Sequence, residues 1–287
     1  MLKYRADLKS LLYMGITTSL FIFLWNAESF NIFLYLWHLF MAVSVSVMAH
    51  NHNHLPMWHS KAMNTITDWW ITCFYGFPIF AWTPTHNQNH HKFVNKEPDY
   101  TKTYRYSEKN NFLTFMTYPS VSGYFQQSAL LNYLKDRYKK NRTAFWMCIL
   151  QIVILVSWIA FFLILDWKKA LIYVVAPQQV SLFAVLIFNY IQHVHADEES
   201  DYNHSRNIVG SLNFFLFNNG LHTAHHMKAN LHWSLLPEAH AKIEPLIDPS
   251  LNERSFWWYV FRVYILGMFG KRFRTKSMRL ERMRAEK

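Results

Sequence analysis

Long apolar stretches alternate along this chain with stretches rich in polar and basic residues. Four of the apolar stretches approach or reach the length needed to cross a bilayer, which is about 20 mostly apolar residues. They cover residues 11–25, 32–49, 145–165 and 171–192. The pattern therefore predicts an all-α integral membrane protein with about four transmembrane helices, forming a single membrane domain over residues 1–287.

Polar residues inside the fourth stretch set it apart from the others. Pro177 is followed there by Gln178 and Gln179, so we expect this helix to kink and to face protein rather than lipid. Two shorter apolar stretches, residues 69–82 and 256–269, are rich in aromatic side chains. We expect them to lie at the membrane interface or to roof a pocket, with a buried core helix as the alternative.

The basic residues orient these spans. Of the 29 Lys and Arg residues, only Lys168 and Lys169 separate the third and fourth spans, and none separates the first and second. Because basic loops stay inside, both termini are predicted to be cytoplasmic. The net charge of +11 and the basic tail, residues 271–287, then suit an anionic headgroup surface, with a solvated end as the alternative for the tail. Nucleic acid is not an expected partner, because no basic binding module accompanies the charge.

Histidine is the unusual residue of the composition. The chain has 16 His but only 2 Cys and no CxxC motif, which argues against thiolate zinc sites and iron–sulfur clusters. Most of the histidines fall in four clusters, each just past an apolar span or in one of the polar blocks outside the spans. These clusters cover residues 50–54, 86–91, 189–195 and 222–226.

Helical spacing predicts which members of each cluster point the same way, because residues three or four apart share a face. The combinations that satisfy this rule are His50 with His54, His86 with His90, Asn189 with His193, and His222 with His225 and His226. His52 and His195 point elsewhere, and a pairing of His54 with His59 stays open. Neutral imidazole binds iron, zinc or copper well, and this many imidazoles exceed the needs of one ion. The clusters therefore predict a site for two metals.

The remaining histidines carry weaker signals. We interpret His38, His204 and His240 as surface or packing residues, and His59 and His232 as intermediate cases.

The clusters resemble the three histidine boxes of the membrane fatty acid desaturase family, H-x3/4-H, H-x2/3-H-H and H/Q-x2/3-H-H. Here the boxes read HNHNH, HNQNHH and HTAHH, and the third follows the last predicted hairpin. The stretch NYIQHVHAD, residues 189–197, resembles an additional element of that family in which an Asn and a His complete the metal shell. The resemblance covers about residues 45–237, and the interleaved His52 departs from it.

The resemblance implies a cytoplasmic helical cap that carries the boxes, two iron ions, and dioxygen as co-substrate. The implied ligands are His50, His54, His86, His90, His91, Asn189, His193, His222, His225 and His226, with Asn189 a weak or water-mediated ligand. Nearby acids are candidates to orient the imidazoles, with solvated loop acids as the alternative: Asp99, Asp197 and Asp201. No catalytic residue beyond the ligands is expected.

The expected function is an oxygen-dependent desaturase that introduces a C=C bond into a lipid or fatty acyl chain. A related di-iron lipid or alkane hydroxylase, or a carotenoid ketolase, stays open, because HHKFVNKEPDY and HHMKANLHWSLLP also resemble ketolases. A zinc-binding receptor or a metal transporter is disfavoured by spans that lack acids. Since no haem or iron–sulfur domain is visible, electrons are expected from a separate ferredoxin, rubredoxin or cytochrome b5 type protein. Candidates to line an acyl tunnel, with interfacial aromatics as the alternative, are Trp69, Trp70, Phe80 and Trp82.

Overall fold

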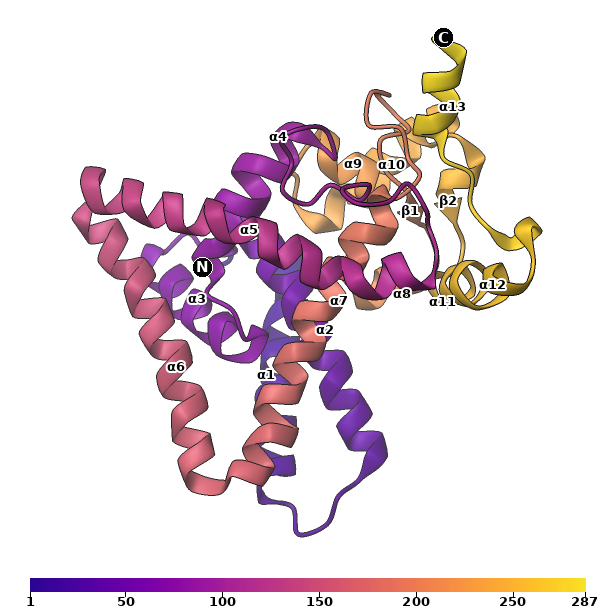
Figure 1. The fold of residues 1–287 in the computed structure, drawn as a ribbon. Helices are drawn as coiled ribbons and strands as arrows, with labels where there is room; N and C mark the ends of the chain where they lie inside the picture. Colours follow the sequence, from indigo (N-terminus) through magenta and orange to yellow (C-terminus); the bar gives the residue numbers. More distant parts are fainter. The chain divides into compact units, whose positions relative to one another are not determined.

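The computed structural model describes residues 1–287 and is all-helical apart from one pair of two-residue strands (Figure 1). Its main helices are α1 (Leu8–Asn26), α2 (Ile32–His54), α3 (Lys61–Tyr75), α5 (Phe112–Lys140), α6 (Arg142–Ala170), α7 (Ala176–His193), α9 (His222–Met227), α10 (Leu236–Ile243) and α13 (Met278–Ala285). Shorter elements are α4 (His91–Phe93), α8 (Leu212–Phe215), α11 (Phe256–Val260), α12 (Gly267–Phe269) and strands β1 (Asn207–Ile208) and β2 (Asn252–Glu253). The predicted all-α class is confirmed.

The chain divides into two compact units. The first unit comprises Met1–Pro84 and Ala129–Val185, and the second comprises Thr85–Ser128 and Leu186–Lys287.

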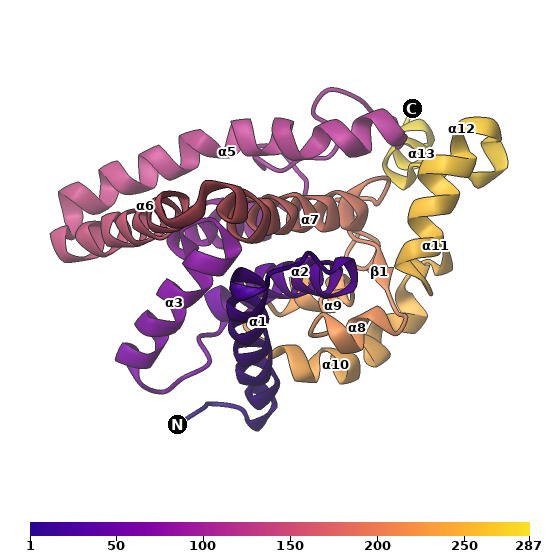
Figure 2. The ribbon, with the colours of Figure 1, turned by 90° about the horizontal axis from the view of Figure 1, so that it is seen from below.

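Helices α1 and α2 of the first unit lie side by side (Figure 2). Helix α2 begins at Ile32 because the Asn31 side chain accepts hydrogen bonds from the first free backbone N–H groups of the helix. It continues without interruption to His54, as the helical pairing of the first histidine cluster requires. Leu24 and Met41 are buried in the core between these helices and α6.

Three helical stretches are long and apolar enough to cross a membrane: Arg5–Asn26, Ile32–His54 and Arg142–His193. The third and fourth predicted spans both fall in the third of these stretches, which is 52 residues long and consists of two helices joined at a sharp bend. Asp166 alone leaves the helical conformation within it, with φ −160° and ψ 100°. Figure 1 shows the chain reversing direction at the lower end of α6.

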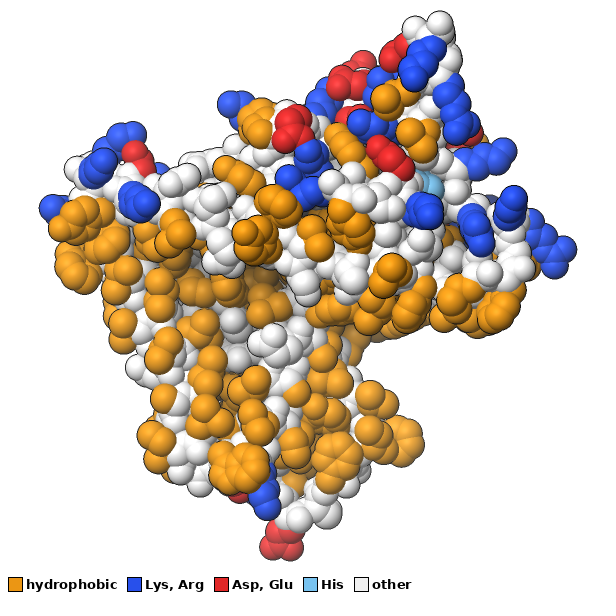
Figure 3. All heavy atoms as spheres, viewed as in Figure 1, with side chains coloured by type: hydrophobic (Ala, Val, Ile, Leu, Met, Phe, Trp, Pro, Cys, Tyr) orange, Lys and Arg blue, Asp and Glu red, His pale blue; other side chains and the backbone are white.

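The reversal follows from the chemistry of Asp166. Its carboxylate accepts hydrogen bonds from the backbone N–H groups of Lys168 and Lys169, at 3.0 and 3.1 Å, and so restarts the helix immediately. The ammonium of Lys169 donates to the carbonyl of Trp25 at the end of α1. On the face drawn in Figure 3, hydrophobic side chains cover α6 along its length, and charged ones gather near its ends.

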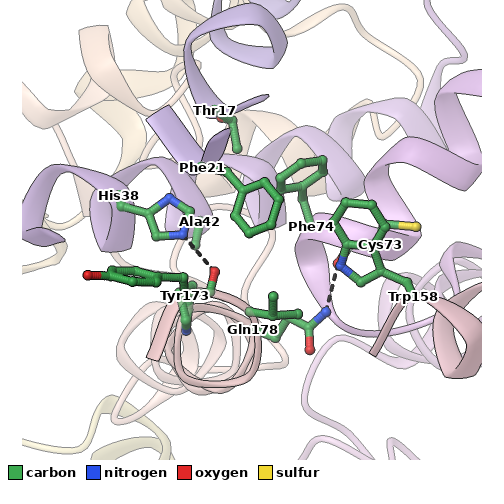
Figure 4. A pocket seen from close by; sticks show the side chains of 11 residues that line it. Thr17, Phe21, His38, Ala42, Cys73, Phe74, Trp158, Tyr173 and Gln178 are labelled. Carbon is green, nitrogen blue, oxygen red and sulfur yellow. Dashed lines mark hydrogen bonds between the residues drawn. The ribbon is translucent and has the colours of Figure 1, made fainter. Parts of the chain in front are cut away.

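Polar side chains inside the apolar stretches form hydrogen bonds with backbone carbonyls of other helices (Figure 4). Pro177 has no N–H to offer to the Tyr173 carbonyl four residues earlier, and His38 Nε2 donates to that oxygen at 2.9 Å. Gln178, which is buried as predicted, donates to the Cys73 carbonyl near the end of α3. His38 is thus a packing residue, as the sequence indicated.

The close approach of Gln178 requires a glycine at the end of α3. Gly76 has φ +82°, and a Cβ on it would lie 2.4 Å from the Cβ of Gln178. The apolar stretch 69–82 is consequently split, with α3 ending at Tyr75. Its buried members, including Ile71 and Trp82, belong to the core of the first unit, which is the alternative we kept open for this stretch.

The second unit has its own core beneath α11. Tyr190 and Ile191 of α7 pack there against Tyr259 and Tyr264. The opposite side of the stretch 256–269 is exposed, with Phe269 at 82%. One apolar face thus lies in the core, as the alternative of a core helix requires, and the location of the other face at a membrane interface stays a prediction.

The basic tail is partly folded. Helix α13 begins at Met278, after the Ser277 side chain has accepted a hydrogen bond from the Leu280 N–H. Arg282 forms ion pairs with Asp197 and Glu198. Part of the positive charge of the tail is therefore matched by acids of the same unit.

Candidate metal centre

The second histidine cluster lies on a π-helical turn, Thr83–His90, that runs directly into α4. A π-helix has wider turns than an α-helix, with hydrogen bonds between residues five apart, so residues five apart also come to lie on one side. His86 and His91 therefore lie together, with their Nε2 atoms 3.1 Å apart, whereas His90 points to a different set of imidazoles. The predicted pairing of His86 with His90 is confirmed only in part: their rings are stacked, with centroids 5.2 Å apart, but their ligand atoms belong to different groups.

The third cluster occupies helix α9. His222 and His226, four residues apart, have their Nε2 atoms 3.0 Å apart. His225 points instead toward His91, with an Nε2–Nε2 distance of 3.0 Å. The three histidines that we expected on one face are thus divided between two directions.

Helix α7 ends at His193, the last of its ligand candidates. His193 Nδ1 donates to the backbone carbonyl of His204, and its Nε2 lies 3.0 Å from His222 Nε2. Asn189, one turn earlier, donates from its amide to the hydroxyl of Tyr118 at 2.6 Å. That bond occupies the amide nitrogen and does not use the carbonyl oxygen, the atom that would act as a ligand.

The second unit therefore gathers seven of the predicted ligands into two groups. Within each group the candidate ligand atoms lie within 4.8 Å of one another. The first group, which we call the quartet, consists of His90, His193, His222 and His226, and the second, the trio, of His86, His91 and His225.

The distances inside the groups fit a bound cation better than hydrogen bonds. In each group one ring nitrogen, that of His222 or His91, lies 3.0 to 3.1 Å from two others. A ring nitrogen carries either one proton or one lone pair, so it makes one good hydrogen bond and not two. Two imidazoles bound at about 2.1 Å to one ion, at right angles, have nitrogens about 3.0 Å apart.

The protonation of the quartet also suits a metal. The His193 Nδ1 proton is held by a carbonyl, so its neutral ring directs a lone pair from Nε2 into the group. His90 Nε2 is buried and has no hydrogen-bond partner. Burial, reinforced by the neighbouring imidazoles, holds the pKa of His226 well below its ordinary value. Neutral imidazole is the form that binds a metal ion.

A buried carboxylate orients one of these rings. Asp99, which is fully buried, accepts a hydrogen bond from His90 Nδ1 at 2.9 Å and others from Thr101 and Asn95. Burial by itself raises the pKa of Asp99. The interactions of Asp99 with His90, together with the hydrogen bonds from Thr101, outweigh that effect and hold this pKa well below its usual range. Asp99 is therefore ionised, as a carboxylate behind a ligand histidine should be.

The other two candidate acids make different contacts. Asp197 pairs with Arg282, and Asp201 offers its backbone carbonyl to His204 Nδ1.

The first cluster lies at the end of α2, in the first unit. The rings of His50 and His54 have centroids 4.8 Å apart, and His50 also lies against Trp82. His52 points elsewhere: its Nδ1 accepts from the Met57 N–H, and its Nε2 lies 3.4 Å from Asp68.

The histidines outside the two groups have local partners or none. His195 bonds to the Glu108 carbonyl and to Thr275, and His232 accepts from the Ser234 N–H. Neither ring nitrogen of buried His240 has a hydrogen-bond partner. His59 contributes a backbone N–H that donates to the Met1 carbonyl.

Two contributors were missed at the sequence level. Thr101 supports Asp99 from two residues away, and the backbone carbonyl of His204 holds His193. The Asp-x-Thr spacing was available as a signal for the first. No side-chain pattern identifies a backbone acceptor.

Fold and site together define an all-helical protein with membrane-spanning candidates and clustered imidazoles that can hold metal ions. The family model for fatty acid desaturase matches residues 29–259. The chain therefore belongs to the fatty acid desaturase family. Comparison with curated proteins and with solved structures found no match.

Proposed function

We propose that this protein is an oxygen-dependent acyl-lipid desaturase that introduces a C=C bond into a lipid alkyl chain at a histidine-ligated di-iron centre. The observation that carries the proposal is the division of seven buried or half-buried imidazoles into two groups within one unit of a fatty acid desaturase family member. Two groups correspond to two ions, and imidazole is a suitable ligand for iron.

The proposed ligand set keeps every residue that the sequence suggested. It comprises His50, His54, His86, His90, His91, Asn189, His193, His222, His225 and His226. A di-iron centre supplies, with dioxygen and two external electrons, the oxidising power to remove hydrogen from an unactivated C–H bond. Burial of His90, His193 and His222 supports the exclusion of water that such chemistry needs.

The chain's own residues hold this centre ready. Burial keeps the imidazole of His226 neutral, so that it is available as a ligand without loss of a proton. The carboxylate of Asp99 and the carbonyl of His204 fix the rings of His90 and His193 through their Nδ1 atoms. Each leaves Nε2 as the atom that binds metal.

We further propose that the two units work as one membrane domain with both termini in the cytoplasm. The reversal at Asp166 supports a chain that crosses the membrane twice between Arg142 and His193, giving four crossings. The distribution of basic residues supports the orientation. The substrate is then a lipid or fatty acyl chain, and the electrons come from a separate ferredoxin, rubredoxin or cytochrome b5 type protein.

The test is expression of the full chain in a host of known lipid composition, with mass spectrometry of its lipids and iron analysis of the purified protein. We expect products lighter than their precursors by two hydrogens, and about two irons per chain. His226→Ala should abolish both, whereas His240→Ala removes a buried imidazole outside the two groups and should retain both. A product that has gained oxygen would instead assign the protein to the related hydroxylases or ketolases. One stoichiometric zinc without an iron requirement would refute the di-iron centre.

A further inference from the structure

The segment His204–Asn207 is buried although all four of its residues are polar. Ser205 and Asn207 are 0% exposed and Arg206 is 2% exposed. Buried polar groups need hydrogen-bond partners, since an unsatisfied group costs about 1–3 kcal/mol. The partners of this segment lie on two helices that carry histidines of the quartet.

The first partner is the end of α7. Arg206 donates from Nη1 to the carbonyls of Ile191 and Val194, at 3.1 and 2.9 Å, and from its backbone N–H to the Gln192 carbonyl at 2.6 Å. The last carbonyls of a helix have no partner within it, and a cation suits their negative end. Together with the bond from His193 to the His204 carbonyl, these contacts surround the ligand candidate at the end of α7.

The second partner is Thr223 of α9, which is fully buried and stands between His222 and His225. Asn207 Oδ1 accepts from the Thr223 N–H at 2.9 Å, and Asn207 Nδ2 donates to Thr223 Oγ1 at 3.1 Å. Thr223 Oγ1 in turn donates to the Ser205 carbonyl and lies 2.9 Å from the Ser205 hydroxyl.

These bonds replace a cap that α9 lacks. The helix has only six residues, and no side chain caps it at Leu221. A helix this short is not stable by itself, so its position depends on outside contacts. Asn207 satisfies one of its free N–H groups from another part of the chain.

We infer that His204–Asn207 is a clamp that fixes His193 relative to His222 and His226, and that Ser205, Arg206, Asn207 and Thr223 are positioning residues for the quartet. The clamp rests on the proposed metal centre, because it requires that the quartet bind a metal ion, but it does not depend on which reaction follows. An experiment that refutes the clamp can therefore be told apart from one that refutes the proposed desaturation.

The test uses the purified full chain, stripped of metal and titrated with cobalt(II) alone. Thr223→Val keeps the side-chain shape but removes the hydroxyl, and Thr223→Ser restores it. Because outer-shell changes cost about 10- to 100-fold in metal affinity, we expect Thr223→Val to bind cobalt at least about tenfold more weakly. Its visible cobalt spectrum should change, and Thr223→Ser should resemble the wild type in both respects.

A matched control separates positioning from general stability. Thr67 of α3 is also buried, donates to the Met63 carbonyl and accepts from Trp58 Nε1. Unlike Thr223, it does not stand next to a proposed metal ligand in the sequence. Thr67→Val should lower the unfolding temperature of the metal-free protein without changing cobalt affinity. The clamp is refuted if Thr223→Val does the same.

A milder variant keeps the test decisive if Thr223→Val does not fold. Ser205→Ala removes one hydroxyl and no bulk, and we expect a smaller but measurable loss of cobalt affinity. Unchanged affinity and spectrum in this variant would overturn the clamp. A wild-type protein that binds no cobalt would refute both the metal centre and the clamp.

Discussion

Replacing Asp99 with Asn removes one charge and changes almost nothing in shape. The carboxylate accepts from four donors: His90 Nδ1 and the Asn95 N–H on one oxygen, the Thr101 N–H and hydroxyl on the other. An amide offers only one oxygen, so one pair of donors meets an NH₂ group. In the better orientation the Thr101 hydroxyl turns to accept, and only one backbone N–H is left unsatisfied, at about 1–3 kcal/mol.

The other orientation affects the ligand directly. There the introduced amide donates to His90 Nδ1, and the ring proton moves to Nε2, the atom that faces the quartet. In both orientations His90 loses a hydrogen bond to a charged group. We therefore expect Asp99→Asn to weaken metal binding about 10- to 100-fold, which is about 1.4 to 2.7 kcal/mol.

Cobalt titration and iron analysis measure the loss of metal affinity, and thermal unfolding of the metal-free protein measures the loss of stability. Asp197→Asn is the matched control, because that carboxylate is also buried in the second unit but pairs with Arg282. It should lose stability and keep its metal. If Asp99→Asn retains metal as well as Asp197→Asn does, Asp99 does not tune the ligand and our reasoning is wrong.

Three further outcomes can be measured. Gly76→Ala should lower the free energy of unfolding by more than about 1 kcal/mol, and with it the unfolding temperature, because Gly76 has a positive φ and an added Cβ would meet the side chain of Gln178. The control Gly15→Ala, which has open space around it inside α1, should be neutral or stabilising. His52→Ala should retain most of the bound iron and His50→Ala should lose it; equal loss in elemental analysis would mean that the first cluster uses another pair. A reporter fused after Lys287 should read as cytoplasmic, and an external signal would overturn the orientation.

The long apolar helices were predictable because their signals are local. The start of α2 at Ile32 depends on a polar cap next to an apolar run, and both are visible in the sequence. The break between the third and fourth spans was placed near the correct residues. The immediate restart of the helix depends on a single carboxylate, that of Asp166. The sequence does not distinguish this residue from an ordinary acid in a loop.

The site was predictable in its membership more than in its arrangement. The seven histidines of the two groups, and the pair His50 and His54, were named from their clustering and from the resemblance to the histidine boxes, whereas Asn189, the tenth candidate, stays a prediction. Which imidazoles share a group could not be read from spacing, because the second cluster lies on a π-helical turn, where His86 lies beside His91 as well as His90. Contacts from distant segments, such as Asn207 with Thr223, follow from tertiary packing that no short motif contains.

The π-helical turn fixes which histidines of the second box lie together. Between His86 and His91 the chain completes one wide turn, and His90 falls just short of it. Loss of one residue from the intervening Asn-Gln-Asn would shift His86 by one position against the two histidines that follow, and would bring a different ring beneath it. The number of residues in this box thus decides which of the two histidine groups each imidazole joins, and a change of length there would alter both groups while every histidine is kept.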